Sequence, residues 1–445
     1  MKFFSFFTNS IRKVLPSPFS IAIILTFLTI ILALFFTKSE NEEKSYFIQV
    51  IGFWEMGFWE LLEFSMQMML ILVLGHVLAL TRVFNSLIRS ATVLCNNTAN
   101  AAFTVTLLTI LVSYLNWGLG LIFGAIFSRK VAEYALEKGI KINYPVIGAS
   151  GYAGLMVWHG GLSGSAPLII AQKDHFLIDQ TGVIPVNETI FSPMNMMVFI
   201  AILVFIPLVM YLIGKRSESQ SIEIEGTADI ASEIIQKTSG AEKMDHSKIF
   251  TYFFSFLIIG YGVYKAFITG NLSVLNLNYI NFILFGLGLL LHGTIFRFIK
   301  AVNSAIIGAS GIFLQFPLYA GIMGIMKYSG LFLVFTEFFI QISNEQSFPV
   351  FTFFSASIVN IFVPSGGGQW AVQGPVIVEA ASQLGASIPK SVMALAYGDQ
   401  LTNMLQPFWA LPLLGITGLK ARDIIPYTFI LMLAGMLIFI VALIL

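Results

Sequence analysis

The stretch PSGGGQW, Pro364 to Trp370, interrupts an apolar segment that extends from residue 348 to residue 385. A second apolar segment, 101–138, is interrupted in the same way by NWGLG at Asn116 to Gly120. Each arm has about 15 to 20 residues, the length that reaches across much of a bilayer. A Gly-rich turn exposed to lipid would leave peptide groups unpaired, at several kcal/mol each. Both segments are therefore predicted to be re-entrant hairpins, which return to the side from which they entered.

The composition around these hairpins is typical of a membrane protein. Of the 445 residues, 57% are hydrophobic and 11% are charged, whereas a soluble domain carries about 25% charged residues. The net charge of +1 provides no basic excess for nucleic acid, and the single Cys95 excludes disulfides and cysteine metal clusters. About nine spanning segments are predicted, at 19–37, 58–80, 144–171, 191–213, 249–268, 278–292, 302–326, 389–417 and 424–445.

Features of the first half recur in the second half in the same order and at nearly the same spacing. They are a glutamine, the asparagine of the hairpin, a proline that opens a helix, and a break within that helix. The pairs are Gln67 with Gln315, Asn116 with Asn360, Pro145 with Pro389, and GLSGSAP at 161–167 with TNMLQP at 402–407. These matches predict an internal repeat in which 144–171 and 389–417 are broken helices.

The distribution of charge predicts the orientation, because Lys and Arg near spanning segments accumulate on the cytoplasmic side. Basic residues mark that side at Lys2, Arg12, Lys13, Arg82, Arg89, 129–141, 214–248, Arg297, Lys300, Lys420 and Arg422, and acids mark the other at Glu40, Glu42, Glu43, Asp174 and Asp179. The halves then have opposite orientation, the plan of many secondary transporters. We expect a first inverted repeat at 1–213, a cytoplasmic linker at 214–248, and a connecting helix with the second repeat at 249–445. The amino terminus is expected in the cytoplasm and the carboxyl terminus outside.

The paired breaks are the predicted place of binding. A helix that begins inside the membrane presents free N–H groups to an anion, and one that ends there presents carbonyls to a cation. The glycines before Trp370 resemble an anion cradle, although such glycines can also serve only to bend a turn. The residues predicted to bind a substrate are Gln67, Asn116, Gly118, Ser163, Ser165, Gln315, Ser365, Gly366, Gly367, Gly368, Gln369 and Asn403.

Amides, hydroxyls and one acid within apolar helices predict a site for a coupling ion. Sodium prefers oxygen ligands, and Asp399 is the acid that lies well inside a predicted span of the second half. The residues predicted to couple sodium at the hairpin tips, or a proton, are Asn116, Ser163, Asn360, Asp399, Thr402 and Asn403. The alternative for each amide is a hydrogen bond between helices. His76 and His159 are either packing residues or members of a proton relay.

Two other classes of function are open at this point. GLSG at Gly161 to Gly164 matches a short motif of intramembrane serine proteases, with Ser163 as the nucleophile. A passive anion channel would use the same cradle without coupling. An aspartyl protease is excluded, because it needs a second acid in the membrane beside Asp399.

Three motifs resemble the short-chain fatty acid transporter family of bacteria: VPSGGGQWAVQGP at 363–375, AYGDQ at 396–400 and QPFWALP at 406–412. The segments LPSPF, GFWELLEF, LNWG and GLSGSAP are similar too. The resemblance implies an inner-membrane symporter of carboxylates such as acetoacetate or butyrate, which is not an enzyme and uses no cofactor beyond Na⁺ or H⁺. It also implies the ion transporter superfamily, with a homodimeric scaffold and an elevator-like motion. The tips NWG and PSGGG depart from the Ser-Asn-Thr tips of that superfamily, which leaves the coupling ion open.

We therefore expect an all-α integral membrane protein. Its predicted plan is an inverted-repeat transporter with about nine spanning helices, two re-entrant hairpins and two broken helices. The expected partners are a small carboxylate, the lipid bilayer and a second copy of the chain.

Overall fold

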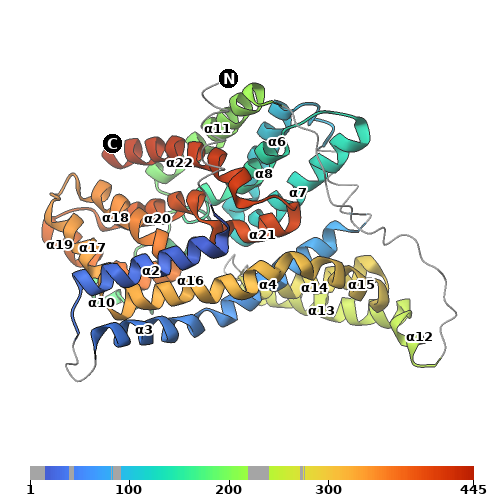
Figure 1. The fold of residues 1–445 in the computed structure, drawn as a ribbon, viewed down its shortest axis with the longest axis horizontal. Coiled ribbons are helices and arrows are strands. Elements are labelled where there is room, and N and C mark those ends of the chain that lie inside the picture. Colours follow the sequence, from blue (N-terminus) through green and yellow to red (C-terminus); the bar gives the residue numbers. More distant parts are fainter. Residues whose placement is uncertain are drawn as a thin grey trace.

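The computed structural model describes residues 16–39, 45–81, 83, 92–218, 240–270, 274 and 276–445. The regular elements of these residues are all helices, as predicted (Figure 1). The charges predicted to set the orientation at Lys2, Arg12, Lys13, Glu40, Glu42, Glu43, Arg82 and Arg89 lie outside the described residues, as does most of the predicted linker 214–248.

The helices of the first half include the first predicted hairpin and the first predicted break. They are α2 (Pro18–Phe36), α3 (Tyr46–Glu60), α4 (Leu62–Ala79), α6 (Thr98–Leu115), α7 (Trp117–Lys138), α8 (Tyr144–Tyr152), η1 (Ala153–Met156), α9 (Ser165–Ile169), α10 (Ile178–Thr181) and α11 (Pro193–Arg216).

The helices of the second half include the second hairpin and the second break. They are α12 (Glu242–Asp245), α13 (Lys248–Thr269), α14 (Leu277–His292), α15 (Ile295–Ala305), η3 (Ile306–Ala309), α16 (Ser310–Tyr328), α17 (Leu331–Gln341), α18 (Phe348–Phe362), α19 (Gly366–Leu384), α20 (Ile388–Thr402), η4 (Asn403–Leu405), α21 (Pro407–Thr417) and α22 (Ala421–Ile444).

The two hairpins are built alike. The second arm of each begins at a capping side chain, since Asn116 Oδ1 accepts from Leu119 N at 3.0 Å and Ser365 Oγ accepts from Gly368 N at 3.2 Å. Each second arm ends at a glycine with positive φ, Gly139 at 67° and Gly385 at 72°, a conformation that suits glycine. Capping and glycine chemistry therefore set the same start and stop signals in both hairpins.

The structure contains several helices that could span a membrane, as predicted. Six described helices are long and apolar enough to cross a bilayer, namely α2, α4, α6, α11, α13 and α22. A seventh crossing is formed if Phe313–Tyr328 and α17, which meet at 61°, count as one. The segments 144–171 and 389–417 are interrupted as expected, and the total of about nine spans stays a prediction.

Helices α3 and α17 lie largely outside the predicted spans. The expected span 58–80 is two helices, because α3 begins at Tyr46 and ends at Glu60, and α4 begins at Leu62. Polar side chains at Gln49, Glu55 and Glu60 interrupt the apolar run of α3, so its sequence does not have the continuous hydrophobicity of a spanning helix. Helix α17 was not predicted because its 11 residues are too few to span a bilayer.

The helices form two groups (Figure 1). The long-helix group consists of α2, α3, α4 and α13 to α16, which pack on one another along one side of the molecule. The broken-helix group consists of α6 to α9, α11 and α18 to α22. The groups meet where α4 packs on α7 and where α16 packs on α21, and α17 contacts both groups. The interrupted helices are thus gathered on one side of this boundary.

Backbone contact holds α3 to α16 within the long-helix group. A Cβ added to Gly57 would lie 2.5 Å from Gly324 Cα, and one added to Gly324 would lie 2.5 Å from Gly57 Cα. No side chain fits at that separation, so small residues allow the two helices to approach closely.

Large apolar side chains face outward on several long helices. Phe35 in α2 is 81% exposed, and Phe253 and Phe267 in α13 are 70% and 82% exposed. Exposed apolar surface of this extent is unfavourable in water and suits lipid or a partner protein. The polar side chains described next are buried instead.

Candidate binding site at the helix breaks

The first hairpin tip meets both helix breaks. Trp117 N donates to Ser163 Oγ at 3.0 Å, and Leu162 N donates to Tyr114 O at 2.8 Å, which joins this tip to the first break. The Trp117 ring lies 5.9 Å from the ring of Trp158 and 5.2 Å from that of Trp409, between ring centroids. Because Trp409 belongs to α21, the second break packs against the same tip.

The second hairpin tip packs on the first break and on the end of α20. A Cβ added to Gly366 would lie 2.6 Å from Trp158 Cη2, 2.8 Å from His159 Cε1 and 3.2 Å from Asp399 Oδ2. A Cβ at Gly367 would have Ser165 Oγ as its nearest neighbour, at 3.7 Å. Glycine at position 366 therefore allows the tip to approach a buried carboxyl group, and the two tips and two breaks lie together.

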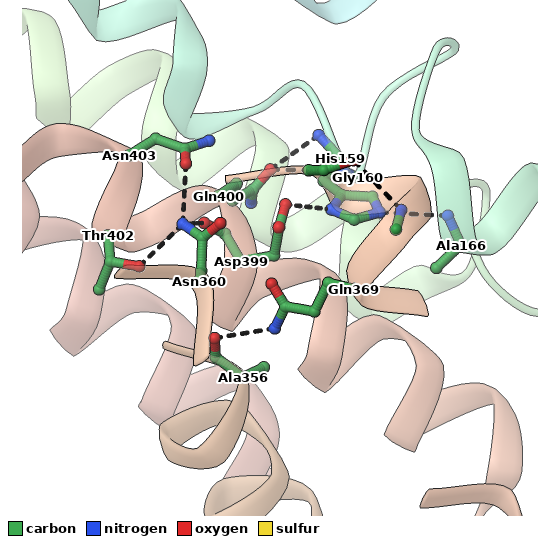
Figure 2. A network of polar contacts seen from close by, with 12 residues as sticks. His159, Gly160, Ala166, Ala356, Asn360, Gln369, Asp399, Gln400, Thr402 and Asn403 are labelled. Carbon is green, nitrogen blue, oxygen red and sulfur yellow. Dashed lines mark hydrogen bonds and ion pairs between the residues drawn. The ribbon is translucent and has the colours of Figure 1, made fainter. Parts of the chain in front are cut away.

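His159 and Asp399 form a buried pair at the centre (Figure 2). His159 Nδ1 lies 2.6 Å from Asp399 Oδ2, and their side chains are 0% and 1% exposed. Ala166 N donates to His159 Nε2 at 3.1 Å. A backbone N–H can only donate, so Nε2 carries no proton, and Nδ1 donates its proton to Asp399. In this geometry the imidazole is neutral and does not balance a charge on Asp399.

Gln400, the residue after Asp399, holds the backbone of the first break. Its Oε1 accepts from His159 N at 2.9 Å and from Gly160 N at 3.4 Å (Figure 2). The opposite face of Gly160 is held by Asn195, whose Nδ2 donates to Gly160 O at 2.8 Å. An irregular buried backbone needs such partners.

Asn360 ties the first arm of the second hairpin to the second break. Its Nδ2 lies 2.6 Å from Asp399 O, 2.9 Å from Thr402 Oγ1 and 2.8 Å from Asn403 Oδ1 (Figure 2). Gln406 Nε2 donates to Asn360 O as well. The sequence predicted that Asn360, Thr402 and Asn403 would act together, and the structure brings them together.

Several oxygens near this network are buried and have no hydrogen-bond partner in the described part of the chain. They are Asp399 Oδ1, Asn360 Oδ1, Gln369 Oε1 and Gln406 Oε1. Leaving such an atom unpaired costs about 1–3 kcal/mol. Asn360 Nδ2 contacts Asp399 O, and Gln369 Nε2 donates to Ala356 O, one turn before Asn360 on α18 (Figure 2). A group of unpaired oxygens is suited to a hard cation or to a proton on the carboxyl group.

A wide cavity opens at the first hairpin tip. It has a volume of about 930 Å³, and its lining includes Gln67, Asn116, Trp117 and Ser163. Gln67 Nε2 donates to Asn278 Oδ1 at 3.0 Å on the same wall. The cavity thus unites three residues predicted to bind a substrate.

Other predicted residues have different surroundings. A Cβ at Gly118 would lie 3.1 Å from Leu277 and 3.2 Å from Ile71, so this glycine serves close packing. Gln315 is not in the lining of the wide cavity, and its Oε1 is buried without a partner among the described residues. Gln67 and Gln315, matched in the sequence, therefore differ in their surroundings.

The geometry does not favour Ser163 as a nucleophile. Ser163 Oγ accepts from Trp117 N, and the ring nitrogens of His159 contact Asp399 and Ala166. His159 is thus not oriented to activate Ser163 as a general base would be.

Sequence reasoning missed Gln400, Gln406, Trp158 and Asn195 as parts of the site. The first two stand inside motifs that were singled out, AYGDQ and QPFWALP, and an amide in an apolar segment was a usable signal. Trp158 and Asn195 carried no local signal, because their roles depend on which segments meet.

The fold and the site together define a multi-pass helical membrane protein with a polar centre at interrupted helices, the class to which membrane transporters belong. The model of the family described as "Short chain fatty acid transporter" matches residues 1–445. The chain belongs to this family, which confirms the resemblance carried by its motifs.

Two bacterial relatives are similar over nearly their whole length, and each is named "Putative short-chain fatty acid transporter". The protein of Escherichia coli (strain K12) is 38% identical over 443 residues, which cover 98% of each chain. The protein of Haemophilus influenzae (strain ATCC 51907 / DSM 11121 / KW20 / Rd) is 37% identical over 433 residues, which cover 95% of this chain and 94% of the relative. Among solved structures, the Alcanivorax borkumensis YdaH transporter is 14% identical with a TM-score of 0.41, covering 96% of this chain and 98% of its own.

Proposed function

We propose that this protein is a secondary active transporter, which carries short-chain carboxylates such as acetoacetate or butyrate by symport with Na⁺ or H⁺ across the bacterial inner membrane. The observation that carries the proposal is the approach of Gly366, at the start of α19, to the buried Asp399. The names of the two relatives support the class of substrate.

The anion would bind at the amino-terminal end of α19. The first N–H groups of a helix carry a partial positive charge, and the glycines from Gly366 to Gly368 allow an oxyanion to reach them. Ser365 would add its hydroxyl. The alkyl chain would lie against the aromatic rings of Trp117, Trp158 and Trp409, which surround the breaks.

Coupling follows from electrostatics. An ionised Asp399 beside this helix end would repel a carboxylate strongly in a medium of low dielectric. The neutral His159 provides no compensating charge. Binding of the substrate therefore favours prior neutralisation of Asp399 by a proton, or by Na⁺ held between Asp399 Oδ1, Asn360 Oδ1 and Gln369 Oε1. Anion and cation would then move together.

Alternating access would use the two groups of helices. We propose that 1–213 and 249–445 hold inverted repeats, that the hairpins are re-entrant, and that the broken-helix group moves as an elevator against the long-helix group. The caps at Asn116 and Ser365 occupy equivalent positions in the two hairpins, which supports the repeat, although the partner of Asn116 is then Ser365 and not Asn360, which lies within α18. The exposed apolar faces of α2 and α13 suit lipid and a second copy in a homodimer. The amino terminus would be cytoplasmic.

The test is uptake of labelled butyrate by proteoliposomes under an imposed sodium or proton gradient. We expect accumulation with one gradient and counterflow without any. A protein that exchanges no labelled butyrate or acetoacetate under either gradient would overturn the proposal. A flux that follows only the anion gradient would identify a passive channel instead.

A further inference from the structure

We propose a second carboxylate-binding position, between α16 and the second hairpin, in which Lys327 receives the carboxylate of a short-chain acid before it reaches the helix breaks. The class of ligand rests on the proposed function. The position itself rests on a separate cavity and on a charged group that the sequence analysis did not select.

The cavity has the size and the lining that a short alkyl chain requires. Its volume is about 110 Å³, and its walls include Met323, Met326, Phe332 and Val359. An apolar cavity of about 150 Å³ in another protein accepts benzene. A cavity of about 110 Å³ therefore suits a chain of about three or four carbons and leaves little room for a longer one.

The charged part of the cavity matches a carboxylate. Lys327 and Glu60 belong to its lining, and Lys327 Nζ lies 3.0 Å from Glu60 Oε1 and 3.2 Å from Oε2. Tyr328 OH also donates to Glu60. Lys327 is 43% exposed in its side chain and Glu60 is 27% exposed, so a carboxylate from solution can compete with Glu60 for the same ammonium group. Glu60 occupies the place of the ligand's head group.

The cavity borders the proposed transport site. Gly368 and Gln369 form part of its wall, and both belong to the first turn of α19, which starts at Gly366. Gln369 is fully buried, and its Oε1 has no partner in the described part of the chain. An acid held by Lys327 would therefore lie beside the first turn of α19, where the transport site is proposed.

The test compares the two members of the ion pair in butyrate uptake by proteoliposomes. We expect Lys327→Gln to raise the KM about tenfold, since it removes a charge-assisted contact at a partly exposed site. Glu60→Gln should lower the KM about threefold, because it removes the competing carboxylate. A purely structural ion pair predicts that both variants change the KM in the same direction or not at all, and either result would overturn the inference.

A matched ion pair away from the cavity is the control. Lys130 Nζ lies 2.7 Å from Glu133 Oε2, and neither residue lines the cavity. Lys130→Gln and Glu133→Gln should leave the KM unchanged. A wild-type protein that takes up no carboxylate refutes the proposed function, whereas wild-type uptake without opposite shifts refutes only the role of Lys327.

The chain-length preference is a second readout, independent of Lys327. Phe332→Leu enlarges the cavity and should raise the uptake of hexanoate relative to butyrate about fourfold, the effect of one further buried methylene. An unchanged ratio would contradict a role of this cavity in recognition.

Discussion

The two hairpin tips have the same helical design and different surroundings. At the first tip Asn116 caps α7 beside a cavity of about 930 Å³. At the second tip Gly366 packs on the buried pair His159 and Asp399, and the adjoining cavity is about 110 Å³. This difference shows that capping residues determine where a helix begins. The side chains opposite a hairpin tip determine whether the tip borders a wide cavity or packs against its neighbours. The predictions below test that difference.

The largest effect is expected from Gly366→Ala, which would disrupt the close contact of the second tip. The added methyl group would lie 2.6 Å from Trp158 and 2.8 Å from His159, so the tip must move away from Asp399. A displacement of about 1 Å at such a site lowers rates about 100-fold. The measurement is butyrate uptake at equal amounts of folded protein.

Two other glycines make the comparison specific. Gly367→Ala places its methyl group 3.7 Å from Ser165 and should reduce uptake far less. Gly260→Ala in α13, where no atom lies within 4 Å of the added carbon, should have no effect. Equal losses at 366 and 367 would contradict the role given to the Gly366 contact.

Asp399→Asn should remove coupling and preserve exchange. The amide keeps an oxygen that can accept from His159 Nδ1, but it needs no cation to neutralise it. We expect accumulation driven by a sodium or proton gradient to disappear, while counterflow stays within about threefold of the wild type, since only the charge-dependent step is lost. Accumulation at the wild-type level in this variant would exclude Asp399 as the coupling group.

Asn360→Ala should lower the stability of the second tip. The change leaves Asp399 O, Thr402 Oγ1 and Asn403 Oδ1 without the amide that contacts them, at a cost of about 1–3 kcal/mol. Thermal unfolding in detergent measures this loss. Asn100→Ala, which removes an exposed hydrogen bond to Asn96, should change stability by less than about 0.5 kcal/mol. Equal losses of stability in the two variants would show that the buried network around Asn360 contributes no more to stability than an exposed hydrogen bond.

The smallest effect is expected at the first tip, from Ser163→Ala. Trp117 N loses its acceptor, but the residue borders the wide cavity, so water can replace the hydroxyl. We expect a loss of stability of at most about 1 kcal/mol and uptake near the wild-type level. Abolished cleavage of a membrane substrate in this variant would instead support the protease alternative.

Local chemistry explains which parts of the fold were predictable. The hairpin break at Asn116 and the helix starts at Pro145 and Pro389 were foreseeable, because capping residues, glycine and proline act within a few residues of themselves. Helix α3 was not foreseen, since Glu55 and Glu60 divide its apolar run.

The site was predictable in its residues and not in its pairings. Asp399 and His159 each drew attention as polar groups in apolar segments, but their contact joins positions 240 residues apart. That contact depends on how the two helix breaks pack against each other, which the local sequence does not indicate. Lys327 was overlooked for the same reason, because its importance comes from the cavity beside it.

The bare contact between Gly57 and Gly324 has a mechanical consequence. Two helices that touch without side chains between them cannot slide by a turn, because other residues would bring side chains against the opposite backbone. α3 and α16 are therefore expected to move together as one rigid unit. If the helix breaks move, the contacts that must change are those between α16 and the second hairpin. The flexible side chains of Met323 and Met326 lie there and would adapt to such a movement.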